Sequence, residues 1–277
     1  MPVTILLYHA VDDTGSFLSV PPAAFGAQMR AVRDAGRPVM SASQLAARIA
    51  AGAPPADAVC ITFDDGYLSV ARNAWPVLRA FGLPATVFLA HDAMGGRPDW
   101  MRRRFADVFV DDVAQAEAAL DRFMPARAVR APALRRDRLG AFRRAAELPI
   151  MGWPEARALA AEGLDFGAHT LSHPVLPGLP PTALAREIGL GRQRIEAALG
   201  RPVTTFAYPY GDHDAASERA VAEAGFEAAV TTAPGAADDA VAQRFRLPRN
   251  GIWPHEGYLR MRLRLSVFAR AARRAAA

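Results

Sequence analysis

Two adjacent aspartates and two histidines four positions apart are the residues of this 277-residue chain whose types and spacing best suit catalysis. Asp64 and Asp65 directly follow an apolar run, and His169 and His173 form an H-x-x-x-H pair. Neighbouring carboxylates raise each other's pKa unless a cation lies close to both. Two histidines and one aspartate are a ligand set for a catalytic divalent metal ion with an open position. With Asp65, His169 and His173 as ligands, Asp64 would remain beside the metal as a general base.

The elements that must position these residues follow from the apolar pattern. Short apolar runs alternate with helical stretches, a pattern typical of parallel βα units. In such folds the C-terminal ends of the strands meet on one face. His9, the aspartate pair, the histidine pair and the segment 206–211 each follow a different run, so we expect them to converge there. The predicted strands lie at 3–8, 37–40, 58–63, 84–90, 164–168, 203–207 and 227–231.

Each of these signals is weak when taken alone. An Asp-Gly pair most often marks a turn, and Pro174 directly after the second histidine favours a loop or single turn over a long helix. The combination at the ends of several strands is what favours a metal site.

Composition and charge set limits on the class of protein. Hydrophobic residues make up 51% of the chain and charged residues 22%, which indicates a folded globular protein and not a disordered one. The single cysteine, Cys60, excludes an internal disulfide and lies in an apolar run. No charged, apolar leader opens the sequence, and no apolar run approaches the length of about 18 residues that a membrane span needs. The expected location is cytoplasmic.

The basic charge is concentrated at the C-terminal end. Residues 258–277 hold six arginines and no acid, against a net charge of +5 for the whole chain. This tail is either a solvated terminal helix or a basic amphipathic surface in peripheral contact with anionic lipid. Nucleic acid is not an expected partner, because no recognition motif accompanies the charge.

One stretch interrupts the alternation of strands and helices. Residues 97–149 carry twelve arginines and eight acids in a helix-like pattern. We predict a helical insertion that acts as a lid or cap, within a single barrel domain spanning 1–257.

The motifs ITFDDGY (61–67), GAHTLSHP (167–174) and FAYPYG (206–211) together resemble the first three motifs of the polysaccharide deacetylase family, the NodB-homology carbohydrate esterases. The likeness extends to ILLYHAV at the start, PATVFL after the first motif and FRLPRNG near residue 250. It covers nearly the whole chain apart from the insertion and the tail.

The resemblance implies a distorted (β/α)7 barrel and a metal-dependent hydrolase that removes acetyl groups from N-acetylated sugars, in polysaccharides or lipid-linked glycans. It implies that Asp65, His169 and His173 bind one divalent ion, Zn²⁺ before Ni²⁺, Co²⁺ or Mn²⁺, and that Asp64 is the base. Tyr210 in the third motif would offer its backbone N–H to the oxyanion. The other residues of that motif, Tyr208, Pro209 and Gly211, are expected to contact the substrate, although Tyr208 could instead fill the core.

The sequence departs from the family pattern in two places that bear on catalysis. The end of the chain has no strand carrying the acid histidine, but Tyr8-His9 resembles the first strand of the poly-N-acetylglucosamine deacetylases, so His9 is the candidate acid. Ala207 occupies the place of the arginine that orients the base. Arg246 or Arg249 could replace it, and we favour Arg249. Trp153 and Trp253 could stack on a sugar ring or fill the core, and we favour the core for both.

Two alternative functions remain open at this point. Related barrels hydrolyse other C–N bonds, such as those of formyl-sugars, small amides or imides. A catalytically silent carbohydrate-binding relative would keep the barrel without turnover, but such a protein needs no general base.

Overall fold

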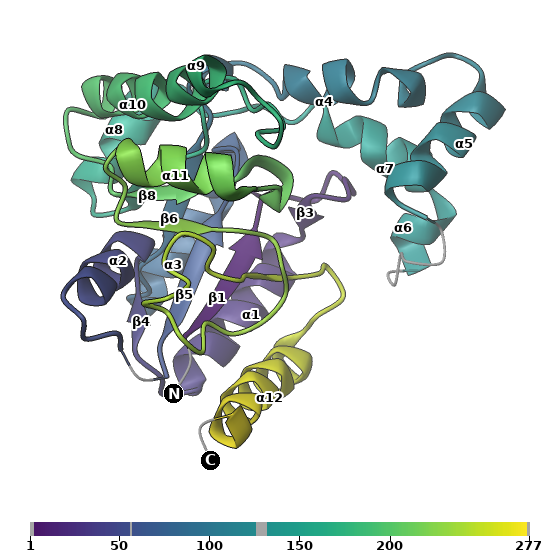
Figure 1. The fold of residues 1–277 in the computed structure, drawn as a ribbon. Coiled ribbons are helices and arrows are strands. Elements are labelled where there is room, and N and C mark those ends of the chain that lie inside the picture. The colour runs from purple at the N-terminus through teal and green to yellow at the C-terminus, as the bar shows by residue number, and fades with distance from the viewer. Residues whose placement is uncertain (1–2, 56, 126–131, 276–277) are drawn as a thin grey trace.

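The computed structural model describes residues 3–55, 57–125 and 132–275. At its centre is a curved, all-parallel sheet with helices around its outer side (Figure 1). The strands are β1 (Thr4–Tyr8), β4 (Val39–Met40), β5 (Val59–Phe63), β6 (Thr86–Leu89), β7 (Asp165–Ala168), β8 (Thr205–Ala207), β9 (Ala228–Val230) and β10 (Asn250–Gly251). Their order is β10-β1-β5-β6-β7-β8-β9, with β4 paired to β5. A separate pair is formed by β2 (Ala10–Val11) and β3 (Ser19–Val20).

All seven predicted strands are present, and the distorted barrel is confirmed by the way the sheet closes. The segment after β9 runs back along it: the Leu247 N–H donates to the Ala229 carbonyl at 2.9 Å, and the Thr231 N–H donates to the Leu247 carbonyl at 2.9 Å. The same segment continues into β10, which pairs with β1 at Leu6 and Asn250. This connection joins the two edges of the sheet.

The helices of the barrel are α1 (Pro22–Asp34), α2 (Ala42–Ala50), α3 (Trp75–Phe81), α8 (Trp153–Ala161), α9 (Pro181–Leu184), α10 (Gly191–Leu199), α11 (Ala215–Glu223) and α12 (Tyr258–Ala275). Two π-helical turns, η1 (Val70–Ala74) and η5 (Ala185–Leu190), lead into α3 and join α9 to α10. Short 3₁₀ turns are η2 (His91–Ala93), η3 (Ala106–Val108) and η6 (Pro209–Gly211).

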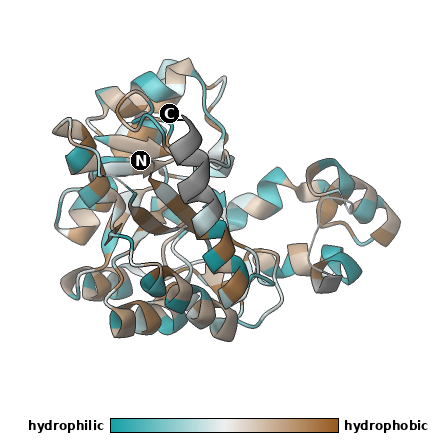
Figure 2. Cartoon of the chain, turned by 90° about the horizontal axis from the view of Figure 1, so that it is seen from below, coloured by the Kyte–Doolittle hydropathy of each residue, from teal (hydrophilic) through white to brown (hydrophobic). Residues whose placement is uncertain are grey.

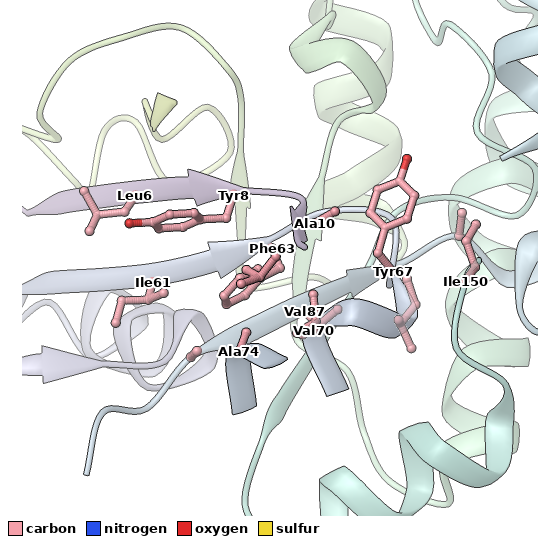
Figure 3. Packing of buried hydrophobic residues seen from close by; sticks show 14 of the residues in the cluster. Leu6, Tyr8, Ala10, Ile61, Phe63, Tyr67, Val70, Ala74, Val87 and Ile150 are labelled. Atoms are coloured by element: carbon pink, nitrogen blue, oxygen red, sulfur yellow. The ribbon is translucent and has the colours of Figure 1, made fainter. Parts of the chain in front are cut away.

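The central strands β1 and β5 are buried on both faces, which explains their continuous apolar sequences. Figure 3 shows Tyr8 of β1 beside Phe63 of β5, with ring centroids 5.5 Å apart. The Tyr8 hydroxyl donates to Gln28 Oε1 at 3.1 Å, so its polar atom is satisfied inside the core. Such packing holds the strand ends, and therefore the residues that follow them, in fixed positions.

Among the described residues of 97–149, four helices and a short 3₁₀ turn extend away from the barrel (Figures 1 and 2). The aromatic rings of Phe17 and Phe142 stack at 5.2 Å, and the Phe17 N–H donates to the Ala141 carbonyl at 3.2 Å. These contacts fix the insertion next to the β2–β3 segment. Its helices are α4 (Asp99–Arg104), α5 (Val113–Phe123), α6 (Pro132–Arg136) and α7 (Arg138–Ala145).

The basic C-terminal segment forms the helix α12, which packs against α1. Met261 and Leu265 are four residues apart and buried, whereas Leu259 and Leu263 are 80% and 61% exposed. Within the described residues, no helix combines the length and apolarity needed to cross a bilayer.

Candidate active site

Three predicted ligands converge at the C-terminal ends of β5 and β7. Asp65 follows β5, and His169 and His173 lie on the loop after β7; all three side chains are buried. The Oδ1 atom of Asp65 is 3.6 Å from His169 Nε2 and 3.3 Å from His173 Nε2. One ligand atom from each residue can be chosen so that all lie within 4.8 Å of one another. That spacing suits three atoms around a common cation.

The chemistry of the donor atoms also fits a metal ion. His169 Nδ1 lies 2.7 Å from the carbonyl oxygen of Ala207; donation to this acceptor leaves Nε2 as the free lone pair. Burial lowers the pKa of His169 to about 4, which favours the neutral, ligating form. Asp65 Oδ1 is buried and has no hydrogen-bond partner among the described residues, and a cation would satisfy it. Burial opposes ionisation of Asp65, but the neighbouring side chains of His173, His9 and His169 hold its pKa below the ordinary value.

Asp64 is held by a buried ion pair with Arg249. The guanidinium Nη1 and Nη2 donate to Oδ1 and Oδ2, each at 2.7 Å, and Nε donates to the Thr231 carbonyl at 2.7 Å. Burial would raise the pKa of Asp64, but the charge of Arg249 outweighs it and lowers that pKa. Arg246 is half exposed and lies 3.7 Å from Glu218, so it does not reach Asp64.

The turn after β5 explains the glycine that follows the two aspartates. Gly66 has a φ of +76°, and a Cβ atom there would lie 2.7 Å from Leu89 Cδ2. Its carbonyl accepts a hydrogen bond from the Met151 N–H at 2.9 Å. Any other residue would be both strained and in collision, so Gly66 fixes the direction in which Asp64 and Asp65 point.

Backbone strain is concentrated at this site. Four of the five non-glycine residues with positive φ among the described residues lie here: Asp65 at 70°, Thr170 at 72°, His173 at 61° and Tyr210 at 61°. Such conformations cost about 1–3 kcal/mol each and persist where the surroundings enforce them.

The histidine loop is supported from behind by the π-helical turn η5. Buried Glu187 accepts hydrogen bonds from the Ser172 N–H and Oγ, both at 2.9 Å, and its carbonyl accepts from the Leu171 N–H. π-helical turns often occur at functional positions. Glu187 was not foreseen from sequence, because no spacing rule links it to the loop.

A pocket of about 440 Å³ is lined by Asp65, His169 and His173 and by further residues that were predicted to belong to the site. His9, immediately after β1, and Tyr210, in η6, line it together with Asp64 and Asp65. The ring of Tyr210 contacts that of His173, with centroids 4.8 Å apart. The sequence-predicted base, acid and oxyanion residues therefore border one cavity.

The three residues of the third motif that were predicted to contact the substrate, Tyr208, Pro209 and Gly211, do not line this pocket. Tyr208 is fully buried and its hydroxyl donates to the Phe245 carbonyl at 2.9 Å, so it belongs to the core, and its assignment to the substrate is corrected. Pro209 is buried beside it. Gly211 instead allows a close approach: its φ is +81°, and a Cβ atom there would lie 2.5 Å from the backbone nitrogen of Thr232.

Several aromatic residues line the pocket without having been assigned to it from sequence, among them Trp100, Tyr67 and Trp253. Trp100 in α4 stacks on the imidazole of His173, with centroids 4.3 Å apart and planes 16° from parallel. The hydroxyl of Tyr67 is buried, and the described part of the chain offers it no hydrogen-bond partner. Trp253 is 46% exposed at the pocket, so its assignment to the core was wrong. Of these residues, only Tyr67 carried a sequence signal that could have placed it at the site, because it directly follows Asp64-Asp65-Gly66.

Comparison with known proteins identifies the family of this chain. The model of the family described as polysaccharide deacetylase matches residues 51–229, which is more than half of the chain. The chain belongs to the polysaccharide deacetylase family. This match confirms the resemblance seen in the motifs, and it includes Asp64, Asp65, His169, His173 and Tyr210.

Individual relatives are more distant. YxkH of Bacillus subtilis (strain 168), which carries a polysaccharide deacetylase name, is 23% identical over 234 residues, covering 84% of this chain and 65% of YxkH. The poly-β-1,6-N-acetyl-D-glucosamine N-deacetylase of Escherichia coli (strain K12) is 33% identical over 108 residues, covering 38% of this chain. The chain spans 65% and 16% of the lengths of these two relatives.

Solved structures share the fold. The Streptococcus pyogenes deacetylase PplD in complex with acetate superposes with a TM-score of 0.68 at 19% identity, covering 94% of this chain and 96% of PplD. IcaB from Ammonifex degensii gives a TM-score of 0.67 at 21% identity, with coverage of 95% and 97%.

Proposed function

We propose that this chain removes acetyl groups from N-acetylated sugars by metal-assisted hydrolysis with Asp64 as general base. The observation that carries the proposal is the buried Asp64–Arg249 pair beside the Asp65–His169–His173 cluster. Asp64 and the three residues of the cluster line one pocket together with His9. Burying a charged carboxylate and a guanidinium is costly, and a protein that only binds sugar has no use for them here. Family membership supports the same reaction.

Asp65, His169 and His173 would hold the metal. Two imidazoles and a carboxylate suit Zn²⁺ best, with Ni²⁺, Co²⁺ and Mn²⁺ as alternatives. When bound, such an ion supplies Lewis acidity to the acetyl carbonyl and makes water more acidic.

Asp64 is proposed to take the proton from the attacking water. Its two oxygens each accept one hydrogen bond from Arg249, which leaves further lone pairs able to accept a proton. Because the lowered pKa keeps Asp64 ionised, the base is available without prior deprotonation. Arg249 keeps the carboxylate plane fixed, the task that the missing third-motif arginine performs in relatives.

The other half of the reaction needs an oxyanion donor and an acid. Tyr210 is proposed to offer its backbone N–H to the developing oxyanion, with its positive φ fixing the direction of that group. His9 is proposed to protonate the departing nitrogen, since an amine leaves poorly without a proton. Both residues line the pocket that contains Asp64.

The proposal is tested with Asp64→Asn and His169→Ala, by measuring metal content and acetate release from N-acetylglucosamine derivatives. Asp64→Asn should keep the metal and lose activity by about 10²–10⁴-fold. His169→Ala should lose both. Wild-type protein that binds metal but releases no acetate would point to another amide, or to a silent binder.

We also propose that α12 contacts anionic membranes from its outer face. Leu259 and Leu263 are exposed there, and exposed Arg260 lies on the same helix. Deleting the whole helix would remove buried Met261 and Leu265, so the informative variant is Leu259→Ser/Leu263→Ser. Vesicles containing phosphatidylserine should cosediment less of this variant than of wild type, and equal cosedimentation would contradict the contact.

A further inference from the structure

The pocket that contains the catalytic groups has two unlike sides. One side is the catalytic floor, which we define as the pocket-lining residues Asp64, Asp65, His169 and His173 together with Arg249, which is buried behind Asp64. The other side is made by the insertion and the β2–β3 segment. We call it the insertion wall, and its pocket-lining members used here are Phe17, Leu18, Met101, Phe105, Phe123 and Phe142.

The insertion wall offers apolar contact and no side-chain hydrogen-bonding group from these six residues. Aromatic rings can cover the face of a sugar, but Leu18 and Met101 cannot satisfy sugar hydroxyls. A further sugar unit placed there would lose hydrogen bonds to water without replacing them, which opposes binding. An apolar chain loses nothing polar on entering the same space.

The exposure of Phe123 strengthens this argument. Phe123 is 48% exposed although it is a large apolar residue that lines a pocket next to catalytic groups. A second large apolar side chain, Trp253, is 46% exposed at the same pocket. Exposed apolar surface beside a reaction site indicates a place where a bound ligand shields that surface from water.

Resting on the proposed function, we propose that the substrate is an N-acetylated sugar that carries a linear apolar chain, and that the insertion wall binds this chain. Alkyl, acyl and isoprenoid chains share the required chemistry. The wall lies in the same pocket as Asp64, so the chain and the reacting acetamide would belong to one molecule.

The test uses methyl, butyl and octyl β-N-acetylglucosaminides below the concentrations at which they form micelles, with β-1,6-linked N-acetylglucosamine oligomers as the polymer comparison. For acetate release, kcat/KM should rise by about fourfold per buried methylene and exceed that of the oligomers. Phe123→Ser should flatten this dependence. The matched control is Val113→Ser, which changes a 61% exposed residue of the same helix that does not line the pocket.

A second measurement does not depend on turnover. Trp100 and Trp253 line the pocket, so their fluorescence can report binding of alkyl glucosides, which have no acetamide to hydrolyse. The change should be larger for octyl β-glucoside than for methyl β-glucoside, and Phe123→Ser should reduce the difference. Equal affinity for both glucosides, or acetate release independent of alkyl-chain length, would contradict binding of an apolar chain by the insertion wall. The proposed deacetylation would not be affected. Chain-dependent binding without acetate release from any derivative would instead refute the proposed reaction and retain the apolar site.

Discussion

The catalytic floor and the insertion wall face the same pocket but are built in opposite ways. On the floor, charged and polar side chains are buried: Arg249 is fully inaccessible and Asp64 is 3% exposed. On the wall, a large apolar side chain is left half exposed at Phe123. Folding alone favours neither arrangement, since buried charge and exposed hydrocarbon are both unfavourable. The floor maintains reacting groups in one geometry, whereas the wall supplies surface that a ligand can cover.

The two regions also differ in what holds them. The floor is attached to the ends of buried parallel strands, and its turns contain strained residues and glycines in tight contact. The insertion consists of short helices that extend from the barrel (Figure 2). Substitutions on the floor should therefore change stability and activity together, while those on the exposed part of the wall should change specificity with little effect on stability.

The largest effect is expected for Arg249→Met, which leaves Asp64 buried without its partner. Breaking a buried ion pair from one side costs about 3–5 kcal/mol in the free energy of unfolding. Urea denaturation measures this loss. Arg246→Met is the matched control from the same segment, and since Arg246 is 54% exposed its stability should stay within about 0.5 kcal/mol of wild type.

The double variant Arg249→Met/Asp64→Asn sharpens this prediction. Replacing the charged carboxylate with a neutral amide should recover part of the lost stability, because the penalty comes mainly from the unpaired charge. Full stability in Arg249→Met alone would show that Asp64 does not depend on a buried partner. It would also contradict the expectation that substitutions on the floor change stability more than those on the wall.

Much of the floor could be predicted from sequence because its residues follow recognisable strands. Apolar runs gave the seven strands, and parallel βα topology places the residues after them on one face. Asp64, Asp65, His169 and His173 follow such runs directly. The position of Arg249 was harder to predict, because the neighbouring strand β10 has only two residues and pairs with β1 at the other end of the chain.

The insertion wall, and the residues that support the catalytic floor, were much harder to predict from the sequence. The helical nature of 97–149 was readable, but nothing in its sequence indicates which helix faces the pocket. Trp100 reaches His173 only through the tertiary placement of α4, and Trp253 was assigned to the core on hydrophobicity alone. Tyr208 was misassigned in the opposite direction: it was expected to contact the substrate, but it is buried in the core beneath the site.

An intermediate effect is expected for Gly211→Ala, next to Tyr210. The left-handed conformation costs a residue with a Cβ atom about 1–2 kcal/mol, and the overlap with Thr232 adds about 1–3 kcal/mol. Acetate release should also fall, because the shift would move the Tyr210 backbone. Thermal or urea unfolding and kcat measure the two effects.

Gly200→Ala separates these two causes. Gly200 also has a positive φ, of 70°, but a Cβ atom there meets nothing within 4 Å. This variant should show the conformational penalty without loss of kcat. Equal losses of stability and activity in both variants would mean that the tight contact at Gly211 does not position Tyr210.

The smallest predicted effect lies where floor and wall meet, at Trp100. This residue belongs to the insertion, yet its indole stacks on the imidazole of the proposed ligand His173. Replacing it with leucine keeps an apolar side chain but removes the flat surface that restricts rotation of the imidazole. Because residues that orient metal ligands contribute about 10–100-fold to affinity, Trp100→Leu should weaken Zn²⁺ binding by about tenfold.

Titration of the metal-free protein with Zn²⁺ against a competing chelator measures this change, and Trp253→Leu is the control. Trp253 lines the same pocket but is half exposed, so its replacement should leave Zn²⁺ affinity unchanged. A tenfold loss confined to Trp100→Leu would mean that the insertion takes part in holding the metal as well as shaping the pocket. Unchanged affinity in both variants would mean that the barrel alone builds the metal site, and the boundary between floor and wall would then lie between Trp100 and His173.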